Sequence, residues 1–76
     1  MREPSRRDLI RAEALKVLEQ AGAPVHFTDI ASVALARLGL ESTVTAKTLN
    51  TCLHDDPQGR FKRVGLGRWI PNAEGP

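Results

Sequence analysis

Basic side chains suited to binding phosphate lie close together near the C-terminal end of this 76-residue sequence. The cluster holds four of the eleven basic residues, and Trp69, the only tryptophan, lies in the same stretch. Its cations are Arg60, Lys62, Arg63 and Arg68. Cations gathered in this way contact the phosphate oxygens of nucleic acids. A polyanion is therefore the predicted partner, although a basic cluster on a small domain can also serve solubility alone.

A second group of polar side chains precedes this cluster and falls on one side of a predicted helix. Lysine, threonine, asparagine and histidine side chains can reach base edges in a DNA groove. The candidate DNA-binding residues in this group are Lys47, Thr48, Asn50, Thr51 and His54. An ordinary solvated helix face has the same composition and is common, so this group taken alone favours that interpretation over a DNA-reading face.

Charge is distributed unevenly along the chain, whose formal net charge is +2. Residues 57–76 sum to +3, and the rest of the chain is close to neutral. The positive field is therefore concentrated near the C-terminal end. Three arginines near the other end, Arg6, Arg7 and Arg11, are expected to extend the same phosphate-binding surface.

The other residue types that support catalysis or metal binding are too scattered to form a site. They are His26, Cys52, His54, Asp55 and Asp56. On a helix, Cys52 and His54 point to different sides because they are two positions apart. The Gly-Leu-Gly sequence at residues 65–67 lacks the third glycine and the following helix of a nucleotide-binding fingerprint. We therefore predict no enzymatic activity, no metal and no cofactor.

Length and composition predict one small soluble domain. With 41% hydrophobic residues the chain can bury a core, and its single cysteine excludes an intrachain disulfide. No apolar run approaches the roughly 20 residues of a membrane span, and the first residues do not lead into a signal-peptide core. These features predict no membrane contact and a cytoplasmic location, associated with the nucleoid if DNA is bound.

Capping signals and apolar spacing predict a first helix that ends near Ala21. Ser5 or Asp8 would cap its start, and Gly22 followed by Pro24 would end it. Its buried face would hold Ile10, Ala14, Val17, Leu18 and Ala21. This helix is therefore expected to be amphipathic and half buried.

A short strand and a second helix are predicted next. The strand would occupy two or three positions within residues 24–27. Thr28 would then cap a helix from about Asp29 to Leu38, and Gly39 would close it.

A third helix is predicted from about Ala46 to Asp56. Thr43 or Thr45 would cap it, and Pro57 would stop it. Its buried stripe would consist of Ala46, Leu49 and Leu53, with Cys52 at the edge. The polar group described above would then face outward, with Asn50 on its flank.

The basic cluster itself is predicted to form a β-hairpin that turns at residues 65–67. Phe61 and Trp69 would anchor the hairpin to the helical body. Strict alternation places Phe61 and Arg63 on one face and the residues next to them on the other, so polar and apolar side chains do not separate. A β-bulge or a twisted, two-sided ribbon would resolve this conflict.

The order of elements predicts the fold class. Helix, short strand, helix, helix and hairpin give a mainly α fold with a small β-hairpin, which is a winged helix-turn-helix of three helices and a C-terminal wing. The expected boundaries are an N-terminal lead at residues 1–7, the domain at residues 8–71 and a flexible tail at residues 72–76.

Four stretches of the sequence resemble one family of winged helices. Three of them read ALKVLEQAG (Ala14–Gly22), PVHFTDIA (Pro24–Ala31) and RFKRVGLGRW (Arg60–Trp69). The fourth, VTAKTLN (Val44–Asn50), stands where that family begins its third helix. In these stretches the sequence is similar to the HARE-HTH family, and the resemblance covers roughly residues 8–71.

The resemblance implies a winged-helix fold and a DNA-associated or transcription-associated adaptor. That family is found in restriction endonucleases, Asx-like chromatin proteins and the delta subunit of bacterial RNA polymerase. Its motifs are mostly structural, so they imply the fold more firmly than an activity.

Two hypotheses of function follow. The leading one is a non-enzymatic module that binds double-stranded DNA with its third helix in the major groove and its wing on the adjacent backbone, in a bacterial transcription or restriction-modification setting. Neutralising about four phosphates would make log affinity fall with log salt at a slope of about −3.6. The alternative is an adaptor that docks on RNA polymerase or a DNA-processing enzyme, which the adjacent Asp55 and Asp56 and the small net charge suggest.

Overall fold

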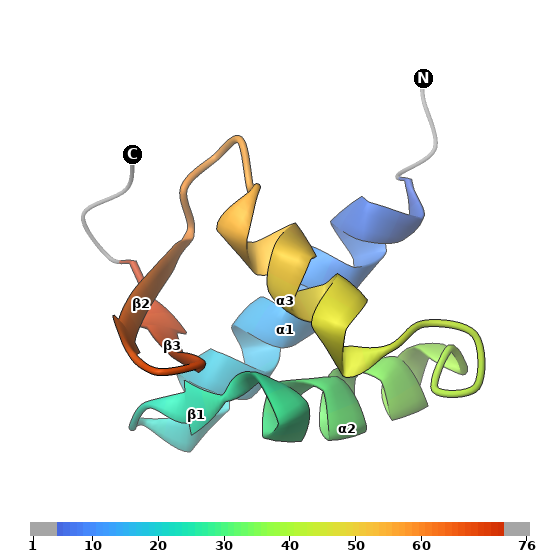
Figure 1. Ribbon diagram of the computed structural model, residues 1–76, viewed down its shortest axis with the longest axis horizontal. Coiled ribbons are helices and arrows are strands. Elements are labelled where there is room, and N and C mark those ends of the chain that lie inside the picture. The colour runs from blue at the N-terminus through green and yellow to red at the C-terminus, as the bar shows by residue number, and fades with distance from the viewer. Residues whose placement is uncertain (1–4, 73–76) are drawn as a thin grey trace.

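Three helices and three short strands make up the computed structural model, which describes residues 5–72 (Figure 1). The elements are α1 (Arg6–Ala21), β1 (Val25–His26), α2 (Phe27–Leu38), α3 (Ala46–His54), β2 (Phe61–Gly65) and β3 (Arg68–Pro71). This order confirms the predicted winged helix-turn-helix. The first four residues of the expected lead and the last four of the expected tail lie outside the described residues.

The strands form one antiparallel sheet in the order β1-β3-β2. Trp69 of β3 lies opposite both Val25 and Arg63, so the short strand before α2 joins the hairpin. The register of β2 shifts between Arg63 and Gly65. This shift confirms the predicted bulge, which lies at Val64 beyond the regular pairs of Phe61 and Arg63. Of the residues of β2 only Phe61 is buried, and Trp69 of β3 is buried with it.

Local hydrogen bonds set the ends of two helices as the sequence predicts. The Ser5 side chain accepts from the Asp8 backbone N–H, and the Asp8 carboxylate accepts from the Ser5 N–H, which makes a capping box. Gly22 ends α1 in the left-handed conformation, with φ of 66°. The Thr45 hydroxyl caps α3 by accepting from the Thr48 N–H at 3.2 Å.

The start of α2 differs from the prediction. The helix begins at Phe27, and its cap is His26, whose Nδ1 accepts from the Thr28 N–H at 3.3 Å. The Phe27 N–H donates to the Gly67 carbonyl in the turn between β2 and β3, at 2.8 Å. Strand pairing therefore extends directly into the helix, and Thr28 is a helical residue.

The end of α3 also differs, because the helix stops at His54 and not at Asp56. The Asp56 carboxylate accepts from the backbone N–H groups of Gln58 and Arg60, which turns the chain toward β2. A carboxylate that binds the backbone ahead of it favours a turn over another helical residue.

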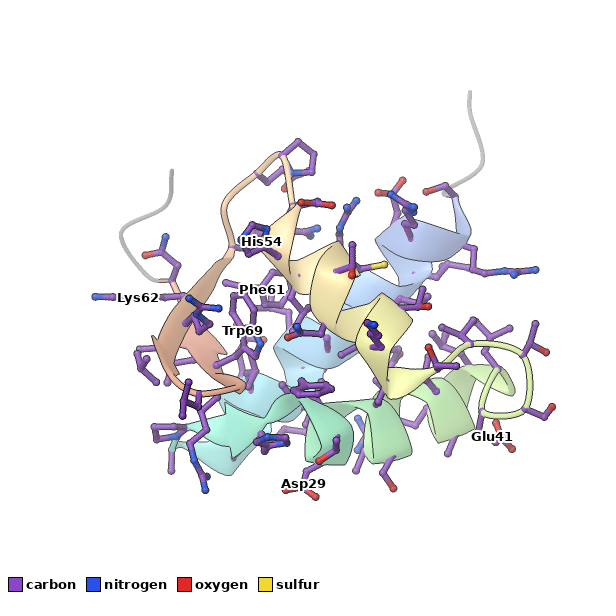
Figure 2. The ribbon with its side chains drawn as sticks, in the orientation of Figure 1. Asp29, Glu41, His54, Phe61, Lys62 and Trp69 are labelled. Carbon is purple, nitrogen blue, oxygen red and sulfur yellow. The ribbon has the colours of Figure 1, made fainter. Side chains whose placement is uncertain are left out.

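The core lies where the three helices meet the inner face of the hairpin. Phe61 and Trp69 are buried in it, which confirms their predicted role as anchors, and Figure 2 shows both pointing from the hairpin toward the helices. Cys52 is fully buried and not at an edge, whereas Ala21 is exposed and lies outside the core that it was expected to join. The buried hydrophobic residues are Ile10, Ala14, Leu18, Ile30, Ala31, Ala34, Leu35, Val44, Leu49, Cys52, Leu53, Phe61 and Trp69.

Candidate nucleic-acid interface

Helix α3 presents one polar face to solvent. Its opposite side is buried through Leu49, Cys52 and Leu53, as the amphipathic spacing requires. The exposed residues are Lys47, Thr48, Thr51 and His54, so four of the five candidates on this helix face solvent. In Figure 1 the helix lies in front of α1, with the wing, defined here as residues 61–71, beside it.

Asn50 is the fifth candidate on α3, and the structure gives it a different position. It is half-buried, and its Oδ1 accepts a hydrogen bond from the indole Nε1 of Trp69 at 2.9 Å. This bond satisfies the only polar atom of a buried tryptophan side chain and joins α3 to β3. Asn50 therefore fixes the wing against the helix, and its carbonyl oxygen is already engaged.

The cations of the wing divide between its two faces. Residues that lie opposite each other on antiparallel strands share a face, so Arg63 is on the face of Trp69, which packs toward α3. Lys62 lies opposite Ile70 on the other face, and Figure 2 shows its side chain directed away from the helices. Arg68 is exposed and directly follows the turn. Among the described residues, none of these three cations forms an ion pair.

Arg60, the fourth predicted phosphate contact of the hairpin, is engaged inside the protein. Its Nε lies 2.9 Å from Asp56 Oδ2, its Nη2 lies 3.3 Å from Asp56 Oδ1, and its guanidinium lies 5.8 Å from the centre of the Phe61 ring. A bidentate pair of this kind holds the guanidinium in place. Arg60 therefore fixes the base of the wing and is not part of the free basic surface.

Arg11 is also internal, which corrects its expected place on a phosphate-binding surface. Only 6% of this residue is exposed. Its Nε donates to the Cys52 carbonyl at 2.9 Å, and its Nη2 donates to the Asp55 carbonyl at 3.4 Å. The guanidinium thus caps the end of α3, where positive charge is favourable. The sequence carried a signal of this burial, because Arg11 stands three and seven positions before Ala14 and Leu18 on the buried face.

Asp56 connects these two arginines. Its side chain is 1% exposed, lies 4.0 Å from Arg11 Nε and accepts from Arg60 at both oxygens. Burial by itself raises the pKa of Asp56, but hydrogen bonds from Arg60 and Gln58 and the charge of Arg60 outweigh it, so the pKa lies below its ordinary value. The carboxylate is therefore ionised and neutralised inside the fold. Only Asp55 of the predicted acidic pair remains exposed, where its Oδ1 lies 3.2 Å from His54 Nδ1.

The wing is thus attached to the helical body at three places. Arg60 and Asp56 hold its base, Trp69 and Asn50 hold its middle, and the Gly67 carbonyl holds its turn to the start of α2. The exposed side of α3 and the free cations of the wing consequently keep a fixed relation to each other.

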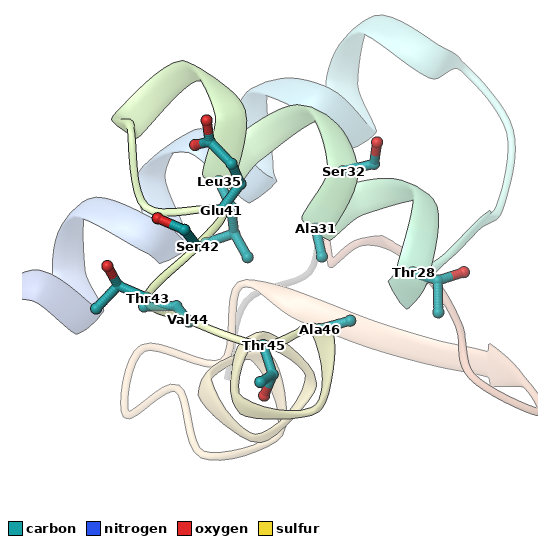
Figure 3. Close-up of a pocket in the computed structure, with 10 residues that line it drawn as sticks. All are labelled: Thr28, Ala31, Ser32, Leu35, Glu41, Ser42, Thr43, Val44, Thr45 and Ala46. Carbon is teal, nitrogen blue, oxygen red and sulfur yellow. The ribbon is translucent and has the colours of Figure 1, made fainter.

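Two surface hollows lie outside this polar face. One, of about 320 Å³, lies between α2 and the loop that leads into α3 (Figure 3). It is lined by Thr28, Ala31, Ser32 and Leu35 of α2 and by residues 41–46. The other, of about 530 Å³, is mostly apolar and is bordered by Leu18 and residues 22–24 on one side and residues 70–71 on the other.

Neither a cluster of metal ligands nor a membrane-spanning helix is found in the described part of the chain. Within residues 5–72, no three histidine, cysteine, aspartate or glutamate side chains lie close enough together to hold a metal ion. The thiol of Cys52 is buried. The helices among these residues are also too short or too polar to cross a membrane.

One of three comparisons with known proteins identifies a family for this chain. Neither the curated proteins nor the solved structures contain a match to the chain. A family model does match over residues 10–72, and its description names the helix-turn-helix (HTH) domain of ASXL and restriction endonuclease proteins. The match includes all of α2, α3 and the wing and most of α1. The chain therefore belongs to the HARE-HTH family.

Proposed function

We propose that this chain is a non-enzymatic winged-helix module that binds double-stranded DNA, with α3 in the major groove and the wing on the adjacent backbone. The observation that carries the proposal is the position of Arg63. It lies opposite Trp69, whose indole is bound to Asn50 of α3, so a free cation stands beside the polar face of that helix. The family is one of DNA-binding helix-turn-helix domains, which supports the same partner. A transcription or restriction-modification setting fits this role.

The proposed surface contains fewer cations than the sequence offers. Its phosphate contacts are Lys47 and Arg63, beside the polar face of α3, and Arg68, next to the turn at the tip of the wing. All three are exposed, and none is ion-paired within the described residues. Arg60 and Lys62 lie outside it. Arg60 is paired with Asp56, and Lys62 is directed away from α3 and stands near the start of β2, farther than Arg68 from the turn.

The groove-facing residues predict modest sequence discrimination. Thr48, Thr51 and His54 present small hydrogen-bonding groups, and none of them makes the bidentate contact by which arginine recognises guanine. Asp55 adds an exposed negative charge at the end of the same helix. Binding is therefore expected to depend chiefly on the phosphate backbone.

Salt-titrated fluorescence anisotropy with a labelled duplex tests this proposal. Three phosphate contacts give a slope of log affinity against log salt of about −2.7. The Arg63→Ala/Arg68→Ala variant should reduce the slope to about −0.9, because each lost contact removes about 0.9. Undetectable binding, or binding that does not respond to salt, would contradict the proposal.

A protein-docking function is the second candidate, and the apolar hollow between α1 and β3 favours it. The adjacent aspartates favour docking less than the sequence suggested, because Asp56 is buried and paired with Arg11 and Arg60. An adaptor for RNA polymerase or a DNA-processing enzyme would keep its partner after nuclease treatment, would lose it in Ile70→Glu, and would show no affinity for DNA.

A further inference from the structure

The turn of the wing exposes apolar side chains to solvent. Leu66 is 97% exposed, and Val64, at the bulge in β2, is 44% exposed. A single exposed apolar residue is ordinary on a protein surface. Leu66 differs in its surroundings, because it occupies the turn of a basic hairpin beside a candidate DNA-binding helix.

The turn is held rigidly in place. The Gly67 carbonyl accepts from the Phe27 N–H at 2.8 Å, and Gly67 has φ of 71°. A Cβ at this position would lie 2.8 Å from His26 Nε2 and 2.9 Å from Phe27 Cδ1, so the turn packs closely on the start of α2. Leu66 is therefore presented on a fixed support and loses little additional backbone freedom on binding.

The residues around Leu66 indicate an anionic partner. Arg63 precedes the turn and Arg68 follows it, and both are exposed and outside any ion pair among residues 5–72. The backbone of the turn requires glycine only at position 67, where φ is positive. Position 66 could hold a polar residue, which is more common in turns, so the turn geometry does not explain the leucine. An apolar side chain between two free arginines matches the surface of DNA, where phosphates border grooves lined by sugars and base edges.

We propose that Leu66 is an apolar wedge that enters the minor groove of double-stranded DNA, with Arg63 and Arg68 on the flanking phosphates. This inference rests on the proposed function, because α3 in the major groove brings the wing over the adjacent backbone and minor groove. Leucine side chains inserted there contact the sugars, partly unstack a base step and kink the duplex. Leu66 thus adds a salt-independent contribution to the affinity for DNA, which otherwise comes mainly from phosphate contacts.

Leu66→Ala tests the wedge, and Leu9→Ala is its matched control. Leu9 is also an exposed leucine, at 42%, but it lies on α1 away from the wing. Leu66→Ala should weaken duplex binding about tenfold, since one buried leucine side chain contributes about that factor. Its salt slope and melting temperature should equal those of the wild type, and the duplex bend measured by energy transfer between end labels should decrease. Leu9→Ala should retain the wild-type affinity and bend.

The possible outcomes distinguish a failure of the proposed function from a failure of the wedge. Wild-type protein that does not bind the duplex overturns the proposed function and the wedge with it. Wild-type protein that binds, with Leu66→Ala showing the same affinity and bend, overturns the wedge alone. Loss of a protein partner in Leu66→Ala with full DNA affinity likewise overturns it, because the leucine would then belong to a protein interface.

Discussion

At the scale of single residues, the neighbours of a polar side chain decide whether it is available to a partner. Arg60 and Arg63 are near in sequence and have the same charge, yet Arg60 is paired with Asp56 and Arg63 is free of ion pairs within the described residues. Asn50 and Thr51 are adjacent on α3, yet only Asn50 is bound to the buried Trp69. Composition predicted the basic character of the wing, but these assignments depended on contacts that the sequence does not reveal.

Asn50 should therefore matter for stability. Asn50→Ala leaves the indole N–H of buried Trp69 without its acceptor, which should lower the free energy of unfolding by about 1–3 kcal/mol in urea denaturation. Asn50→Asp keeps an acceptor and should recover part of the loss. The exposed neighbour is the control, since Thr51→Ala should change stability by less than about 0.5 kcal/mol. Equal stabilities for Asn50→Ala and Thr51→Ala would contradict this role.

Asp56 makes the stability of the fold depend on acid pH. Its folded pKa lies below the unfolded value of 3.8, so its contribution is fully present above that value and is lost as pH falls through the lower, folded pKa. Urea denaturation between about pH 5 and pH 2 should therefore show a steeper loss of stability for the wild type than for Asp56→Asn.

At neutral pH the same substitution should cost about 2 kcal/mol, because it weakens the charge-assisted hydrogen bonds that the buried carboxylate accepts from Arg60. The neighbouring Asp55→Asn, whose side chain is exposed, is the matched control and should follow the wild-type acid profile. Parallel profiles for wild type and Asp56→Asn would show that the buried carboxylate is not responsible for acid sensitivity.

At the scale of elements, local sequence signals correctly predicted which helices and strands form and their order along the chain. The capping box at Ser5, the left-handed Gly22 and the hydroxyl cap at Thr45 all act within a few residues, so they are visible in the sequence. The two boundary errors have different causes, a non-local contact for α2 and a local turn for α3. Helix α2 begins early because its first N–H reaches the wing turn, and α3 ends early because Asp56 binds the backbone that leads into β2.

The wing turn provides a test at this scale. Gly67→Ala should lower the melting temperature by several degrees, because an alanine there adopts positive φ and collides with His26 and Phe27. Gly65→Ala is the matched control, since its added Cβ meets nothing within 4 Å and its φ is not in the left-handed region. If both variants melted with the wild type, the turn would not be held to α2 in the way described.

At the scale of the whole molecule, charge is sorted between the interior and the surface. Arg11 and Asp56, which are buried, and Arg60, which is half-buried, form a charged group that ties α1, the end of α3 and the base of the wing together. The family resemblance and the periodicities predicted this architecture. They did not predict the group itself, because Arg11 meets its partners more than forty residues away in the chain. That separation explains why the predicted basic surface was larger than the one the fold exposes.

The comparison that most directly tests DNA binding by α3 and the wing is between Arg63→Ala and Lys62→Ala. Both variants remove one exposed cation from β2, but Arg63 lies on the face of Trp69 and α3, whereas Lys62 lies on the opposite face. In salt-titrated anisotropy, Arg63→Ala should weaken duplex binding and reduce the salt slope by about 0.9, and Lys62→Ala should keep the wild-type slope. Equal losses in the two variants, or no binding by the wild type, would contradict the proposed interface.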